Sequence, residues 1–191
     1  MAAIDNIVLT ALENIVGPDR VLTGTEDLQR YGCDWTRVYT PNPAAVVLPD
    51  SIEQVQEIVR LAAREGLAIV PSGGRTGLSG GAVASNGELV LALDRLNYVE
   101  DFSSIDRTVR CGAGAVTEQL QQYAMERGLF YPVDFASSGS SQIGGNVSTN
   151  AGGIKVIRHG MTRDWVAGLK VVNGTGAVAD THLTLPTNRE V

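Results

Sequence analysis

The chain has 191 residues, a hydrophobic fraction of 43% and a formal net charge of −6. This length can bury one substantial core, and the acidic balance argues against nucleic-acid binding, which needs a basic surface. The two cysteines, Cys33 and Cys111, form no C-x-x-C pair and have no nearby histidine, so no metal site is expected. Residues 1–6 lack a basic signal region, no apolar run reaches the roughly 20 residues of a membrane span, and we expect a cytoplasmic protein.

The first predicted element is a helix over residues 2–16. Its apolar side chains recur at a spacing of three to four residues, and Gly17-Pro18 ends the pattern. Residues 31–44 are polar and aromatic and contain proline, so they are interpreted as an irregular lead-in.

A strand–helix–strand unit follows. Short apolar strands are predicted over 45–48 and 67–70. Ser51 and Gln54 would begin the helix between them as a capping box, and Gly66 would end it in the left-handed conformation. Continuous apolar strands joined by a crossover helix favour parallel pairing in a buried sheet.

The later elements are more mixed. They are predicted as strands over 89–93 and 109–111, a helix that Thr117 caps and that runs to Arg127, and a hairpin of 166–172 with 177–179. The Asn173-Gly174 turn makes this hairpin antiparallel. The fold class is therefore α+β, with a parallel part followed by a mainly antiparallel part.

The most informative stretch is the glycine-rich segment that follows the second strand. It has five glycines among residues 71–81 but neither a Gly-Lys-Ser/Thr ending nor a Gly-x-Gly-x-x-Gly pattern. Glycine-rich backbone lets consecutive N–H groups converge on an anion, and the end of a parallel strand is where open sheets bind ligands. The candidate ligand-binding residues here are Pro71, Ser72, Gly73, Gly74, Arg75, Thr76, Gly77, Leu78 and Ser79.

A second glycine-rich segment covers residues 139–153 and carries small hydrogen-bonding side chains. Two such segments suit a long, phosphate-containing cofactor that is held at several points, whereas two unrelated mobile loops are the alternative. The candidates in this segment are Ser140, Ser141, Gly144, Gly145, Asn146, Ser148, Asn150, Ala151 and Gly152.

Three stretches, Pro71–Val83, Ile143–Gly153 and Arg158–Asp164, resemble the FAD-binding (PCMH-type) domain of the vanillyl-alcohol-oxidase flavoprotein superfamily. The similarity is greatest to the branch of D-lactate dehydrogenase, the glycolate oxidase FAD subunit and D-2-hydroxyglutarate dehydrogenase. It extends over about residues 31–180. The resemblance implies a two-subdomain fold, with a small parallel βαβ subdomain and a larger, mainly antiparallel α+β subdomain, and FAD between them.

The resemblance also implies roles for particular residues. Arg75 stands where covalent flavoproteins of the superfamily commonly have histidine, which implies non-covalent FAD. Pro132 and Asp134 match a Pro-x-Asp segment near the flavin, which favours a cofactor role for Asp134 over that of a turn former or helix cap. His159 replaces the tyrosine that usually precedes Gly160, and we assign it no catalytic role. No Ser-His-Asp set or paired carboxylate is evident, so no catalytic residue is assigned.

Family members are more than twice as long, and their substrate-binding residues lie beyond the part matched here. We therefore expect a C-terminally truncated domain, with an N-terminal helix and lead-in over 1–42, the incomplete FAD-binding domain over 43–180 and an atypical tail over 181–191. The expected function is oxidation of a small D-2-hydroxy acid substrate, with electrons passed to an acceptor of unknown identity. The alternatives are an enolpyruvyl-sugar reductase or molybdenum-hydroxylase FAD subunit, and an isolated flavin-binding or electron-transfer module.

Overall fold

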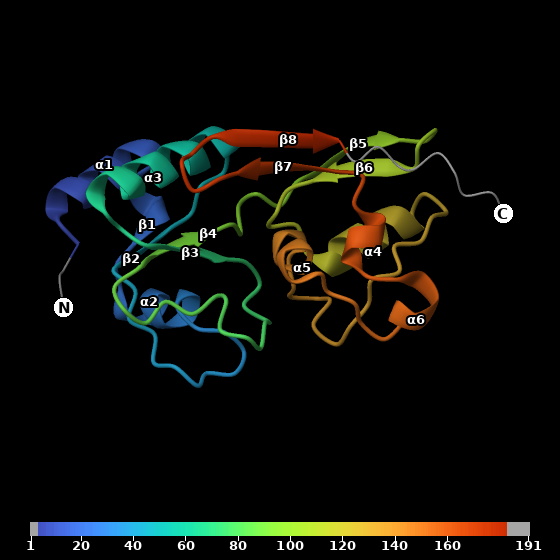
Figure 1. Ribbon diagram of the computed structural model, residues 1–191, viewed down its shortest axis with the longest axis horizontal. Coiled ribbons are helices and arrows are strands. Elements are labelled where there is room, and N and C mark those ends of the chain that lie inside the picture. Colours follow the sequence, from blue (N-terminus) through green and yellow to red (C-terminus); the bar gives the residue numbers. More distant parts are fainter. Residues whose placement is uncertain (1–3, 183–191) are drawn as a thin grey trace.

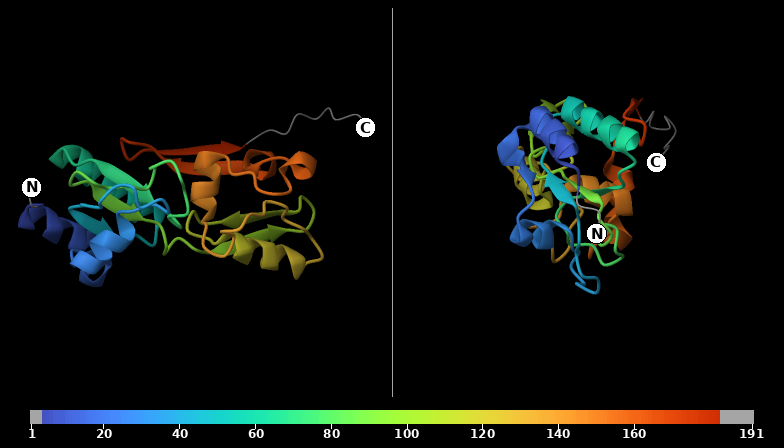
Figure 2. Two further views of the ribbon diagram at one scale, coloured as in Figure 1. Left: turned by 90° about the horizontal axis from the view of Figure 1, so that it is seen from below. Right: turned by 90° about the vertical axis from the view of Figure 1, so that its left-hand side faces the viewer.

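The computed structural model describes residues 4–182, which form two lobes side by side (Figures 1 and 2). The first lobe contains α1 (Asn6–Val16), a 3-10 turn (Pro18–Arg20), β1 (Val21–Leu22), α2 (Thr25–Tyr31), β2 (Ala45–Val47), α3 (Ile52–Glu65), β3 (Ile69–Ser72) and β4 (Leu89–Ala92). The second contains β5 (Val99–Ser103), β6 (Thr108–Cys111), α4 (Thr117–Met125), α5 (Ile143–Thr149), α6 (Val156–His159), a 3-10 turn (Thr162–Trp165), β7 (Gly168–Val172) and β8 (Val178–His182).

The first lobe is built on one sheet with the strand order β1-β2-β4-β3. The predicted parallel direction of β2 and β3 is confirmed, but the two strands do not pair with each other, because β4 lies between them and pairs parallel with both. Only β1 is antiparallel. All four residues of β4 are buried, as expected of a central parallel strand. The strand β3 lies at the sheet edge and runs two residues further than predicted, so Pro71 and Ser72 belong to it. The first glycine-rich segment therefore leaves the carboxyl end of an edge strand.

Helix α3 begins and ends at the predicted residues. The hydroxyl of Ser51 accepts a hydrogen bond from the Gln54 amide at 3.2 Å, and Gly66 adopts a φ of 67°. The capping box differs in one bond, because the Gln54 side chain accepts from the amide of Asp50, at 2.9 Å, rather than from that of Ser51. The predicted start of α3 is therefore correct, and only the second hydrogen bond of the capping box involves a different residue.

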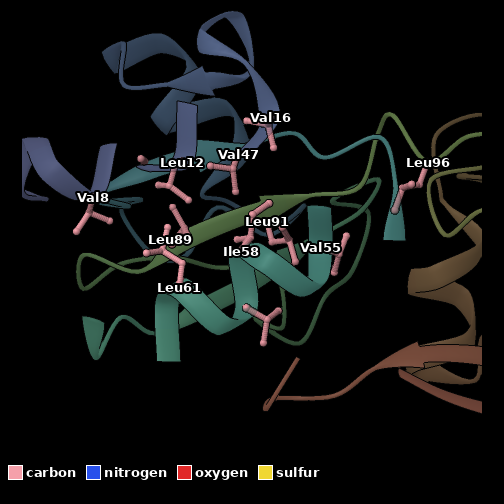
Figure 3. Packing of buried hydrophobic residues seen from close by; sticks show 12 residues of the cluster. Val8, Leu12, Val16, Val47, Val55, Ile58, Leu61, Leu89, Leu91 and Leu96 are labelled. Carbon is pink, nitrogen blue, oxygen red and sulfur yellow. The ribbon is translucent and has the colours of Figure 1, made fainter. Parts of the chain in front are cut away.

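The core of this lobe lies where α1 and α3 pack against the sheet (Figure 3). Leu12 of α1 and Ile58 of α3 are fully buried there, and truncation of such a side chain to alanine costs about 2–5 kcal/mol. Helix α1 starts at Asn6 because the Asp5 carboxylate caps it, accepting from the Ile7 amide at 2.9 Å. The predicted start was four residues earlier, and residues 1–3 lie outside the described part.

The second lobe contains two antiparallel hairpins, β5–β6 and β7–β8. The β7–β8 hairpin was predicted, whereas β5 was missed because its sequence, Val-Glu-Asp-Phe-Ser, is too polar to indicate a buried strand. Helix α4 ends at Met125 rather than Arg127. The prediction for Thr117 was wrong: it is the first helical residue, and its buried hydroxyl bonds to Ser141 instead of capping the helix.

The second glycine-rich segment is partly helical, although no helix was predicted there. Helix α5 begins directly after Gln142 and includes both Gly144 and Gly145. A side chain at Gly144 would come within 2.7 Å of the Ala113 Cβ, so glycine there permits close packing of α5. Glycine at position 144 therefore meets a packing requirement.

The β7–β8 hairpin reaches from the second lobe to α3 of the first, along the top of Figure 1. At its tip the carbonyl oxygen of Gly176 accepts hydrogen bonds from the side chains of Gln56, at 2.8 Å, and Arg60, at 2.9 Å. The last described strands thus tie the two lobes together.

Candidate cofactor-binding site

The two glycine-rich segments meet between the lobes. A Cβ atom on Gly74 would lie 2.9 Å from both the Ser140 carbonyl carbon and the Ser141 Cα, which no substituted residue tolerates without movement of backbone. The Gln142 side chain lies against Gly73 in the same way, with its Oε1 3.3 Å from a Cβ built there. The structure therefore brings together two segments that lie about 70 residues apart in sequence.

The first segment presents a row of backbone N–H groups. Within residues 4–182, none of the amides of 74–79 donates a hydrogen bond to the protein. Arg75 adopts a φ of 58°, whereas Gly74 and Thr76 have no positive φ. A left-handed residue between right-handed or extended ones turns successive N–H groups toward one point, a geometry that binds anions such as phosphate. Backbone of this shape is suited to binding an anion as the acceptor of these N–H groups.

Asp34 ends the amide row and fixes the lead-in against it. Its carboxylate accepts from the Gly80 amide at 3.1 Å, from the Thr36 amide at 2.9 Å and from the Thr36 hydroxyl at 2.6 Å. The bond from the Thr36 hydroxyl, followed by bonds from backbone amides, holds the pKa of the Asp34 carboxyl below its ordinary value although burial opposes this. Sequence reasoning did not single out Asp34, because its partners lie as far as 46 residues away.

Arg75 turns away from the row of amides. Its guanidinium donates to the Gly73 carbonyl oxygen at 2.6 Å and to the Asp94 carboxylate at 3.3 Å. The guanidinium carbon lies 4.6 Å from the ring centroid of Tyr31, within the range of a cation–π contact. These contacts hold the first segment in a fixed conformation and leave the guanidinium turned toward the protein.

A buried polar cluster supports the second segment. The Thr117 hydroxyl lies 2.7 Å from that of Ser141 and accepts from the Asn146 side-chain amide at 2.6 Å. All three side chains are more than nine-tenths buried, and satisfied buried networks of this kind hold backbone in one arrangement. Ser141 and Asn146 thus fix the position of α5 relative to α4.

The exposed face of α5 is open at Gly145. A Cβ atom there would meet no other atom within 4 Å, so backbone is accessible at this position. Ser148 and Thr149 bond back to the carbonyl oxygens of Gly144 and Gly145, at 2.8 and 3.0 Å. Asn150 adopts a φ of 49° and accepts from the Arg163 amide at 3.1 Å. Its amide therefore holds the third matched stretch against the second.

Two further hydrogen bonds join the second segment to that third stretch. The carbonyl oxygen of Ala151 accepts from both the amide and the hydroxyl of Thr162, at 2.9 and 2.7 Å. Gly152 lies close to Val156, whose Cγ2 would be 3.2 Å from a Cβ at this glycine. These contacts fix the backbone that follows α5.

Asp134 and its neighbours lie beside the backbone that follows α5, where Asp134 pairs with Gly153. The Asp134 carboxylate pairs with Lys155 at 2.9 Å, and Pro132 is fully buried. Burial raises the pKa of the neighbouring Tyr131 phenol to about 12. His159 stacks edge-on against Phe130 and offers its backbone carbonyl to the Trp165 indole at 3.0 Å. The ion pair engages the Asp134 side chain within the protein.

One polar atom at the junction of the segments has no partner. The Oε1 of Gln142 is buried, and within the described residues no donor reaches it. A buried acceptor without a donor costs free energy, and its place beside Gly73 puts it next to the row of free amides. Sequence reasoning missed Gln142 because a glutamine before a glycine pair carries no motif of its own.

Comparisons with known proteins show which family and which relatives the chain is similar to. A family model described as "FAD binding domain" matches residues 43–182. The chain is 56% identical over 184 residues to the D-2-hydroxyglutarate dehydrogenase of Stutzerimonas stutzeri (strain A1501), which covers 96% of the chain and 40% of that relative. It is 40% identical over 170 residues to the mitochondrial D-2-hydroxyglutarate dehydrogenase of Bos taurus, covering 89% of the chain and 31% of the relative.

Solved structures show the same fold at low sequence identity. An alkyldihydroxyacetonephosphate synthase aligns with a TM-score of 0.85 at 20% identity, over 97% of this chain and 36% of that one. A p-cresol methylhydroxylase aligns with a TM-score of 0.77 at 22% identity, over 96% and 36%. The chain spans about a third to two fifths of the length of the curated relatives it matches.

Proposed function

The chain belongs to the FAD binding domain family, and from this premise we propose that its two glycine-rich segments hold the cofactor for oxidation of a D-2-hydroxy acid by the complete protein. The fold is the α+β PCMH-type fold that the resemblance implied, and FAD is the family's cofactor. The observation that carries the proposal is the row of free amides of 74–79, placed against the second segment. A diphosphate supplies the acceptors that these amides lack.

We propose different roles for the two glycine-rich segments. Within residues 71–79, the free amides of 74–79 bind the diphosphate, and the exposed backbone at Gly145 lets the cofactor approach α5. The remaining candidates position these groups: Pro132, Asp134, Ser140, Ser141, Gly144, Asn146, Ser148, Asn150, Ala151 and Gly152. The internal bonds of Ser141, Asn146 and Asp134 favour this supporting role.

The flavin is proposed to be held without a covalent bond. The side chain at the position that carries the linking histidine in covalent relatives is Arg75, and a guanidinium does not form that bond. Its fork is already engaged by Gly73 and Asp94. Cys33 and Cys111 are both free thiols and lie outside the two glycine-rich segments.

The substrate assignment rests on the relatives. Those from Stutzerimonas stutzeri and Bos taurus are named D-2-hydroxyglutarate dehydrogenases, so among the three enzymes that the resemblance suggested we favour D-2-hydroxyglutarate. When bound, FAD supplies the hydride acceptor for oxidation of the hydroxyl-bearing carbon. The chain's own residues bind and orient it. The reduced cofactor then needs a separate electron acceptor.

Two further assignments stay predictions. A cytoplasmic location fits the bacterial relatives, whereas the Bos taurus relative is named mitochondrial. The division into 1–42, 43–180 and 181–191 stays a prediction as well. In the described part of the chain no helix is long and apolar enough to cross a membrane, and no group of three acidic, histidine or cysteine side chains could hold a metal ion.

The test uses the complete natural polypeptide that contains this chain. After reconstitution with FAD, reduction of a dye acceptor is followed with D-2-hydroxyglutarate, D-lactate and glycolate, and with the L-enantiomers as controls. We expect turnover with D-2-hydroxyglutarate and little with its L-form. A holoprotein that is inert to every 2-hydroxy acid but is reduced by a nicotinamide cofactor would contradict the proposal and favour the reductase alternative.

A further inference from the structure

The Arg75 side chain folds back onto the segment that carries it. Its Nη1 lies 2.6 Å from the carbonyl oxygen of Gly73, two residues earlier, and 3.3 Å from the Ser72 hydroxyl. Ser72 is fully buried at the end of β3. The guanidinium is therefore attached to the sheet side of the segment, close to the point where β3 ends.

The bond to the Gly73 carbonyl fixes the direction of the next amide. A trans peptide is planar, so its C=O and N–H point to opposite sides. With the Gly73 carbonyl directed at the guanidinium, the Gly74 N–H must point away from it. That N–H donates to nothing within residues 4–182 and begins the row of free amides. Arg75 thus sets the orientation of the peptide on which the row starts.

The charge of Arg75 is already balanced. Asp94 lies 3.3 Å from Nη2, and the side chains of Arg75 and Asp94 are 16% and 27% exposed. The Tyr31 ring lies beside the same guanidinium. A direct bond from Arg75 to a phosphate would break the Asp94 pair and leave a carboxylate beside an anionic ligand, which is unfavourable in a partly buried site.

We propose that Arg75 is a positioning residue, not a phosphate ligand. It aims the Gly74 amide at the diphosphate of FAD through the Gly73 carbonyl, and Asp94 holds it there. The inference rests on the proposed FAD site and adds the means by which the free amides are oriented. It assigns a role to Asp94, which none of the sequence motifs includes.

Replacement of Asp94 separates this role from direct binding, because the two predict opposite signs. If Arg75 binds a phosphate directly, its release from Asp94 in Asp94→Asn would leave it free to reach that phosphate, and the affinity for FAD should rise or stay the same. A positioning residue loses its anchor, so FAD should dissociate about tenfold more readily, equivalent to about 1.4 kcal/mol. The readout is the FAD dissociation constant of the complete polypeptide, from flavin fluorescence, with circular dichroism to establish that each variant is folded.

Arg75→Lys and Arg75→Met complete the set. Lysine keeps the charge but lacks the planar fork that reaches Gly73 and Asp94 together, so both variants should bind FAD about as weakly as Asp94→Asn. The double variant Arg75→Met/Asp94→Asn should be no weaker than Arg75→Met. The matched control is Asp101→Asn, which removes an exposed ion pair with Arg110 in the second lobe and should bind FAD like the wild type.

Two results would overturn the inference while leaving the FAD site intact. One is Asp94→Asn binding FAD as tightly as the wild type or more tightly. The other is a difference between the two Arg75 variants, in which Arg75→Lys keeps its affinity for FAD while Arg75→Met loses both that affinity and its dependence on salt concentration. This is the behaviour of a positive charge that contacts a phosphate directly. Failure of the wild-type polypeptide to bind FAD would instead refute the proposed function, and the inference with it.

Discussion

Gly74 lies so close to the backbone of Ser140 that any side chain at position 74 would overlap it. The two glycine-rich segments therefore cross at a point where only glycine fits. Gly74→Ala should force the segments apart and lower the free energy of unfolding by about 1–3 kcal/mol, with loss of FAD binding. Chemical denaturation of the apoprotein and an FAD titration measure the two effects. If Gly74→Ala had the stability and the FAD affinity of the wild type, the close contact between Gly74 and Ser140 would be refuted.

Gly145→Ala should separate stability from binding. A Cβ there meets nothing within 4 Å, and alanine in a helix is favoured over glycine by about 1 kcal/mol. The apoprotein should thus be equally or more stable, whereas FAD should bind more weakly because the methyl group occupies the cofactor's approach. Gly174→Ala, in an open turn of the second lobe, is the control. If Gly145→Ala and the wild type bound FAD with equal affinity, the cofactor would not approach α5 at this position.

Acid precipitation of the holoprotein should leave all flavin in the supernatant, since Arg75 offers no atom for a flavin bond. The pellet, examined by denaturing electrophoresis, should show no flavin fluorescence in the protein band. Fluorescence that survives denaturation would contradict non-covalent binding.

The attachment of Asp34 to the first segment should weaken in acid. Its folded-state pKa lies below the ordinary value of 3.8, so its contribution to stability is complete above pH 3.8 and is lost as the pH falls through the lower folded-state value. The free energy of unfolding of wild type should exceed that of Asp34→Asn above this pH, and the gap should close below it. A gap that does not change with pH would show that the carboxylate charge is not what holds Gly80.

The 191-residue chain, reconstituted with FAD, should not turn over a 2-hydroxy acid. A substrate carboxylate needs a cation that clamps it, and the resemblance implies that the family's substrate-binding residues lie beyond the part matched here. Of the cations near the site, Arg75 is paired with Asp94 and Lys155 with Asp134. The dye-reduction assay, run beside the complete polypeptide, makes the comparison. Robust turnover by the short chain would place the substrate-binding groups within it.

Local signals were enough to predict the elements that depend on neighbouring residues. Ser51 and Gly66 delimit α3 by contacts within a few positions, so this helix and the parallel direction of the strands on either side of it followed from the sequence. Asp34 and Gln142 could not be found in this way, because their significance comes from groups that only the fold brings near. Thr117 misled for the same reason: it has the chemistry of a cap, but burial against Ser141 determines its bonds.

The same distinction explains α5. Its glycines indicated loop flexibility, yet Gly144 is required by the approach of Ala113, which lies 31 positions earlier in the sequence. A pattern of small residues does not by itself distinguish a mobile segment from a closely packed helix. The meeting of the two segments was expected only as a consequence of binding one ligand, and the structure shows it in the packing of Gly74 against Ser140.

The carbonyl of Gly176 joins the lobes by bonds to residues 116 and 120 positions earlier. During synthesis, the first lobe leaves the ribosome long before this carbonyl exists, and the second segment emerges only after residue 140. The nascent chain consequently cannot make these two bonds between the lobes until the hairpin has been synthesised. We therefore expect the final arrangement of the two lobes, and cofactor binding with it, only after translation of this region.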